Sequence, residues 1–197
     1  MLFHILTTLL TILNRSLMAK RYRQSKGKEI RPVYFVFCEG ESEEAYITYI
    51  RSKYRVPIEI KSKVARSRIN QKFVNRVLKS FTRHENDKTF LFYDLDVPEM
   101  LSRLLSIHGV ILLVSNPCLE LWYILHTCNH SAESTSQQIL GQLDRICHGY
   151  KKGSICVRLN HGLTTGEDQA CIRAKRLTSF NNPSTTVYRL IEEIRAV

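Results

Sequence analysis

The chain is short of acidic residues, of glycine and of proline. Its 197 residues hold 18 Asp and Glu against 29 Lys and Arg, which gives a formal net charge of +11 at pH 7. Such an excess of positive charge favours a polyanionic partner, most often nucleic acid, although solubility alone also accounts for a basic chain. The 8 Gly and 5 Pro exclude a low-complexity or collagen-like chain. The length is that of one globular domain.

Several motifs that would indicate a particular chemistry are also missing. The six cysteines include no CxxC pair and no zinc-ligand spacing. A disulfide framework is not expected at this size, so we expect a reducing, cytoplasmic setting. The sequence has no P-loop, no dinucleotide-binding glycine fingerprint and no Ser, His and Asp in the order of a hydrolase triad. Any energy from ATP must therefore come from another chain.

No apolar run is long enough to span a bilayer. Residues 2–13 are too short for a transmembrane helix, and no Lys or Arg precedes them as in a signal peptide. We interpret residues 1–17 as an extension outside the core, with an amphipathic membrane-surface segment as the alternative, and expect no integral membrane association. Residues 18–31 read as a basic arm suited to phosphates, with six basic residues and one acid from Lys20 to Arg31.

Apolar runs alternate with helical periodicity from residue 33 onward. The runs at 33–38, 89–93 and 110–114 are solidly apolar, as strands buried on both faces are, and 56–60 reads as a shorter strand. The expected helices are 41–53, 71–81, 98–106 and 117–128. This order predicts an α/β fold with a mostly parallel sheet flanked by helices, in a single domain over residues 32–197. From about residue 131 the pattern is mostly helical, with loops around 149–166 and a last helix opened by residues 182–184.

Acidic residues stand directly after two of the buried strands. Glu39 follows the first strand, and Asp94 and Asp96 follow the strand at 89–93. The carboxyl ends of parallel strands share one edge of a sheet, so we expect the three carboxylates in one crevice. Asp94 and Asp96 are two apart in an extended segment and therefore point to the same side. Because hard cations take oxygen ligands, we predict Mg²⁺ or Mn²⁺ at all three residues, with Glu39 as ligand or general acid/base.

Neighbouring residues are expected to support this site. Gly40 allows a tight backbone turn, and acids early in a helix, Glu43 among them, are explained by the helix dipole alone. Asn116 is expected to cap the helix at 117–128. Glu120, one turn into that apolar helix, either pairs with an Arg or Lys or faces the acidic crevice. The supporting candidates are Gly40, Glu43, Ser115, Asn116 and Glu120.

Basic side chains that could hold a polyanion come from two further segments. The helix at 71–81 is basic, and a lysine pair follows Tyr150 in a stretch that a solvated loop also explains. The nucleic-acid-binding candidates are Lys72, Arg76, Lys79, Lys151 and Lys152.

Five segments together resemble the RloB-like proteins: CEGESEEAYI, YDLD, SNPCLELWYILH, YKK at 150–152 and NPSTTVYRLIEEI. The element SNPxxExW is the most specific of them, and Leu119 stands where an aromatic residue is usual. The family is similar in fold to the Toprim domain. There, a glutamate after the first strand and a DxD after a later strand serve metal-dependent phosphoryl transfer. The resemblance implies those roles for Glu39, Asp94 and Asp96.

RloB-like proteins are typically encoded beside an ABC-type or AAA ATPase in bacterial anti-phage or restriction-associated loci. The resemblance therefore implies a metal-dependent nuclease effector that acts on phosphodiester bonds with a partner ATPase. The alternative is a non-catalytic subunit that binds nucleic acid or a nucleotide and regulates the ATPase. A primase-type nucleotidyltransferase is a third hypothesis, but the sequence contains no recognisable nucleotide-binding element that would support it. The choice between DNA and RNA, and assembly as a homo-oligomer, stay open.

Overall fold

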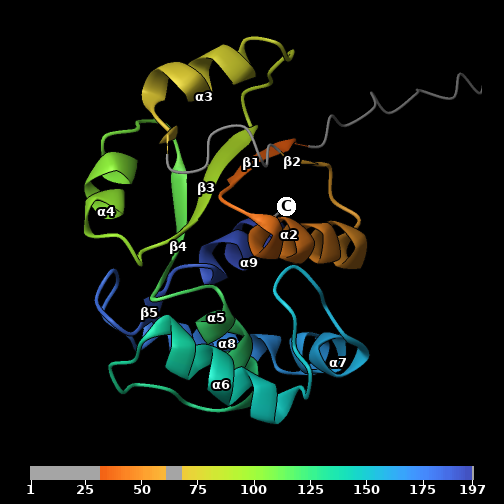
Figure 1. Ribbon diagram of the computed structural model, residues 1–197. Coiled ribbons are helices and arrows are strands. Elements are labelled where there is room, and N and C mark those ends of the chain that lie inside the picture. Colours follow the sequence, from red (N-terminus) through yellow and green to blue (C-terminus); the bar gives the residue numbers. More distant parts are fainter. Residues whose placement is uncertain (1–31, 61–67, 197) are drawn as a thin grey trace, which may run out of the picture. The chain divides into compact units, whose positions relative to one another are not determined.

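A computed structural model describes residues 32–60 and 68–196 of the chain (Figure 1). The predicted extension 1–17 and basic arm 18–31 lie outside these residues. One sheet has the strand order β2-β1-β3-β4-β5, with the first four strands parallel and β5 antiparallel to β4. The predicted α/β fold with a mostly parallel sheet is thereby confirmed. The strands are β1 (Tyr34–Cys38), β2 (Ile58–Ile60), β3 (Lys88–Asp94), β4 (Ile111–Asn116) and β5 (Ser184–Thr185).

Helices cover both faces of this sheet. In Figure 1, α3 and α4 lie together on one side of the sheet, away from the group formed by α5 to α8. In the described residues, none of the helices is both long and apolar enough to cross a membrane. The helices are α2 (Glu41–Tyr54), α3 (Gln71–Leu78), α4 (Pro98–Leu105), α5 (Glu120–Thr127), α6 (Ser136–Ile146), α7 (Val157–Thr165), α8 (Glu167–Lys175) and α9 (Tyr188–Arg195).

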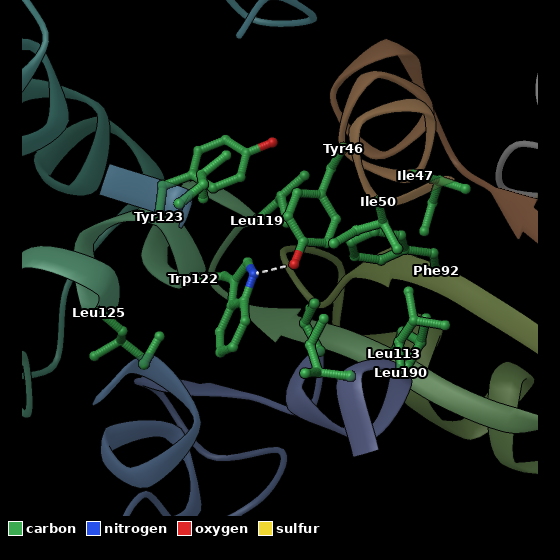
Figure 2. Packing of buried hydrophobic residues seen from close by; sticks show 14 of the residues in the cluster. Tyr46, Ile47, Ile50, Phe92, Leu113, Leu119, Trp122, Tyr123, Leu125 and Leu190 are labelled. Atoms are coloured by element: carbon green, nitrogen blue, oxygen red, sulfur yellow. Dashed lines mark hydrogen bonds between the residues drawn. The ribbon is translucent and has the colours of Figure 1, made fainter. Parts of the chain in front are cut away.

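The strands contribute side chains to two hydrophobic cores, one on each face of the sheet, because successive residues of a strand point to opposite faces. Phe35 and Leu91 belong to the core under α3 and α4. Val36 and Phe92 belong to the larger core under α2, α5 and the C-terminal helices. Figure 2 shows this larger core, with Trp122 of α5 close to Tyr46 of α2. The solid apolar strands that the sequence showed are thus explained by burial on both faces.

The C-terminal portion is helical, as predicted, but two of its details were wrong. Residues 157–165, expected among loops, form helix α7. Residues 182–184, expected to open the last helix, lead instead into β5, and the last helix begins at Tyr188. The reason lies in the sheet. Ser184 and Thr185 pair with Asn116 and Ser115 of β4, and this ladder outweighs the local helix-start signal.

Candidate metal centre

The pairing of β1 with β3 places Glu39 beside Asp94. Cys38 stands opposite Phe92 in the parallel register, and the backbone N–H of Glu39 continues the ladder to the carbonyl of Phe92 at 3.0 Å. Both strands leave the sheet at the same edge. There the backbone N–H of Asp94 donates to Oε2 of Glu39 at 3.0 Å. The Glu39 carboxylate, at the end of β1, therefore contacts the backbone at the end of β3.

Two further carboxylates, from α2 and α5, accompany this pair. Glu43 is 4% exposed and Glu120 is 0% exposed. Burial, followed by the charges of Glu43, Glu120 and Glu39, raises the pKa of Asp94 well above its usual range. Burial also raises the pKa of Glu43 to about 7, and the charges of Glu39 and Glu120 add to this shift. We call Glu39, Glu43, Asp94 and Glu120 the acidic cluster.

Asp96 is exposed and stands at the rim of this cluster. Burial raises the pKa of Glu39, the hydrogen bond from Asp94 opposes this change, and the charge of Asp96 adds to it. Asp96 therefore lies near enough to act on Glu39. The structure brings all three predicted ligands to one edge of the sheet, but Asp94 is half-buried, with its Oδ1 enclosed, whereas Asp96 is exposed.

Two buried oxygens of the acidic cluster have no hydrogen-bond partner among residues 32–60 and 68–196: Oδ1 of Asp94 and Oε2 of Glu120. A buried carboxylate oxygen without a partner is unfavourable unless a proton or a cation neutralises it. Across residues 32–60 and 68–196, no three His, Cys, Asp or Glu side chains form a group that could by itself hold a metal ion. Mg²⁺ usually takes one or two carboxylates and completes its shell with water and substrate phosphate. The donor set fits a cation of that kind, held by few protein ligands.

Gly40 serves this cluster differently from our expectation. Its φ of −149° is an extended conformation that any residue adopts, so no tight turn requires glycine here. The N–H of Gly40 donates to Oε2 of Glu43 at 2.9 Å, and a Cβ at Gly40 would stand 3.3 Å from that same oxygen. Glycine therefore leaves room for the Glu43 carboxylate to fold back over the start of α2.

The helix dipole was an incomplete explanation of Glu43. Glu43 is buried together with Tyr46, Ile47 and Ile50 of the same helix, while Glu41 is exposed. Positions 43, 46, 47 and 50 follow the i, i+3, i+4, i+7 spacing of a helix face that packs inward. This spacing was visible in the sequence and distinguishes Glu43 from its acidic neighbours.

The side chains of Ser115 and Asn116 make hydrogen bonds to the C-terminal segment. The Ser115 hydroxyl pairs with the Thr185 hydroxyl at 2.9 Å, and the Asn116 amide donates to the carbonyl of Phe180 at 3.0 Å. The predicted cap was also wrong, because α5 begins only at Glu120 and has Leu119 at its N-cap. Both residues instead hold the C-terminal segment against β4.

The charge of Glu120 acts both on Asp94 and on Lys152, so each of our two alternatives describes part of its surroundings. Its Oε1 accepts a hydrogen bond from the Tyr150 hydroxyl at 3.0 Å. Tyr150 belongs to residues 147–156, which join α6 to α7 and which we call the strap. Further along the strap, the N–H of Gly153 donates to the Ser42 hydroxyl of α2 at 3.2 Å. Sequence reasoning did not find these two contacts, because they join segments more than 25 residues apart.

Of the five basic candidates, the structure brings Lys152 of the strap near the acidic cluster. Partial burial alone lowers the pKa of Lys152, but the charges of Glu120 and Asp94 outweigh it and raise the pKa above its usual value. Lys151 is exposed. The remaining three, Lys72, Arg76 and Lys79, are exposed on or next to α3, which packs on the sheet face opposite to α2 and α5.

Comparison with known proteins gives one result. No curated protein and no solved structure matches the chain. The sequence model of the family described as RloB-like protein matches residues 34–194. This match runs from β1 to α9 and includes every residue of the acidic cluster. The chain therefore belongs to the RloB-like family.

Proposed function

We propose that this protein is a metal-dependent nuclease effector of bacterial anti-phage defence, which cleaves phosphodiester bonds together with a partner ATPase. One observation carries the proposal: buried carboxylates with two unpartnered oxygens at the carboxyl edge of a parallel sheet. This edge is where open α/β sheets bind ligands. The net charge of +11 supports a polyanionic substrate. Membership of the RloB-like family supports the defence setting.

The proposed roles follow from where each carboxylate stands. One or two of the carboxylates of Asp94, Asp96 and Glu39 would hold Mg²⁺ or Mn²⁺, with water and substrate completing the shell. A bound divalent ion supplies charge stabilisation at the phosphate and orients an attacking water. Glu39 also serves as general acid/base, since its raised pKa brings it closer to neutral pH. Glu43 and Glu120 lie on the buried side of the cluster and keep its charge high enough to attract the cation.

The test is incubation of the purified chain with labelled single- and double-stranded DNA and with RNA, including tRNA. Each reaction contains Mg²⁺, Mn²⁺ or EDTA, with and without the ATPase encoded beside it. We expect cleavage that needs the metal and that disappears in Asp94→Asn. If the metal binds and no substrate is cut even with the ATPase present, the nuclease proposal is wrong.

The alternative is a non-catalytic subunit that binds nucleic acid or a nucleotide and regulates the ATPase. This alternative expects the chain to change the ATPase rate while it leaves every nucleic acid intact. Measuring the ATPase rate and cleavage in the same reactions separates the two functions.

A further inference from the structure

The strap crosses the carboxyl edge of the sheet and is attached on both sides of the acidic cluster. On the α5 side, the Tyr150 hydroxyl donates to Glu120 at 3.0 Å. On the α2 side, the Gly153 N–H donates to the Ser42 hydroxyl at 3.2 Å. Gly153 has a φ of +77°, and a Cβ there would stand 3.1 Å from Cβ of Glu41. The strap therefore lies directly against the start of α2, and glycine is needed at that point.

The start and the turn of the strap are fixed as well. Oδ1 of Asp144 accepts from the N–H groups of Gly149 at 2.9 Å and Tyr150 at 3.3 Å. The carbonyl of Lys151 accepts from the N–H of Ser154 at 3.1 Å and from its hydroxyl at 2.9 Å. A loop held at so many points presents its remaining side chains in defined positions.

Lys152 lies between the two attachment points, and it is exposed to solvent. Its charge acts on Asp94 and Glu39 and opposes the rise in their pKa values that burial causes. A lysine that only neutralised the cluster would be expected among buried ion pairs, as Lys53 is with the buried carboxylate of Glu167 at 2.7 Å. Lys152 remains open to a molecule that approaches the cluster from solvent.

A phosphodiester that approaches four carboxylates is repelled unless positive charge stands nearby. A divalent cation supplies part of that charge, and a fixed ammonium at the mouth of the site supplies more where negative charge grows during the reaction. We propose that Lys152 is a catalytic residue that binds a non-bridging oxygen of the substrate phosphate, and that Tyr150 is its positioning residue through Glu120. This inference rests on the proposed nuclease function and assigns the substrate-facing side of the same site.

In the step concerned, the oxygen of a water molecule forms a bond to phosphorus and the bond from phosphorus to the leaving sugar oxygen breaks. The attacking water loses one proton to a general base, and the leaving oxygen gains one from a general acid. Lys152 keeps its proton throughout, so it contributes charge and position and takes no part in proton transfer.

The test compares Lys152→Ala and Lys152→Arg with Arg158→Ala, which removes an exposed positive charge near the start of α7, just beyond the strap. We expect Lys152→Ala to lower the single-turnover cleavage rate by roughly 100- to 1000-fold, Lys152→Arg to recover part of it, and Arg158→Ala to change it less than about 3-fold. Tyr150→Phe removes only the hydroxyl. It should lower kcat/KM by roughly tenfold, with part of the loss in KM, because a misplaced Lys152 binds the phosphate less well both before and during the reaction.

A binding measurement separates failure of this inference from failure of the nuclease proposal. Calorimetry with Mn²⁺ alone should show tighter binding to Lys152→Ala than to the natural chain, because a competing positive charge is gone. Thymidine 5′-phosphate should then bind the Mn²⁺-loaded natural chain at least several-fold more tightly than Lys152→Ala. If Lys152→Ala and Arg158→Ala behave alike in both titrations and in rate, Lys152 has no such role. If the titrations differ as expected but no nucleic acid is cut, the nuclease proposal is wrong and Lys152 stands as a phosphate-binding residue.

Discussion

The hydroxyl of Tyr46 accepts a hydrogen bond from the indole Nε1 of Trp122 at 2.8 Å, with both side chains fully buried (Figure 2). Tyr46 lies one turn after Glu43 in α2, and Trp122 lies two residues after Glu120 in α5. The bond therefore fixes the relative position of the two helices that bring carboxylates to the acidic cluster from outside the sheet. A feature of the core thus sets the geometry of the candidate site.

Tyr46→Phe should destabilise the protein by about 1–3 kcal/mol, because the buried indole N–H of Trp122 loses its acceptor. Urea unfolding measures the change. Tyr49→Phe is the matched control, since the Tyr49 hydroxyl makes an exposed contact with Thr164 at 3.1 Å. We expect that control to lose well under about 1 kcal/mol, and equal losses would contradict the role given to Tyr46.

Glu43→Gln should make the metal-free protein more stable at neutral and alkaline pH. The folded-state pKa of Glu43 is raised to about 7 from 4.5. As pH rises between these values, the unfolded chain releases its proton first, so the natural protein loses stability, and the loss is complete above the folded pKa. Gln carries no charge and escapes the loss, which we put at about 1–3 kcal/mol. Melts in EDTA from pH 4.5 to pH 8 should show the two curves diverging, whereas the exposed Glu41→Gln should track the natural protein.

Gly166→Ala should destabilise the fold by about 2–3 kcal/mol, because overpacking forces the backbone to shift. A Cβ at Gly166 would stand 2.2 Å from the carbonyl oxygen of His126. Thermal melting should fall by roughly 5–10 °C. Gly162→Ala provides the control within α7: its Cβ would meet nothing within 4 Å, and alanine favours a helix interior over glycine by about 0.5–1 kcal/mol. Equal melting temperatures for the two variants would show that the α5–α8 contact is looser than described.

The double change Asp94→Ala and Asp96→Ala should abolish activity and leave the fold intact or slightly more stable, since it relieves repulsion within the acidic cluster. Millimolar Mg²⁺ or Mn²⁺ should raise the melting temperature of the natural protein by mass action, and that of the double variant much less.

Asp87→Ala gives the opposite pattern for a structural aspartate. Its two carboxylate oxygens accept from the N–H groups of Val33 at 2.7 Å and His84 at 2.8 Å. Truncation should cost about 1–3 kcal/mol, and stabilisation by metal should be unchanged. If metal stabilises the Asp94/Asp96 double variant as much as the natural protein, the cation does not bind at the acidic cluster.

The sequence predicted the strands, most helices and the edge at which Glu39 and Asp94 meet, because solid apolar runs and their order along the chain suffice for a parallel sheet. It did not predict β5, since two residues carry no periodicity and their pairing with β4 depends on a segment nearly 70 positions away. The same holds for Tyr150 and Ser42, whose partners are 30 and 111 positions distant. Contacts between segments so far apart leave no periodic pattern in the local sequence.

The antiparallel strand β5 has a consequence for how the protein is made. The edge of β4 next to the acidic cluster stays unpaired until residues 184–185 have left the ribosome and folded back. Thr186 then completes the closure, because its hydroxyl accepts from the N–H of Val114 at 2.9 Å and donates to the carbonyl of Leu112 at 2.9 Å. An unpaired strand edge invites pairing with other chains. A nascent chain that stalls before residue 184 therefore exposes an unpaired strand edge, on which other chains can pair.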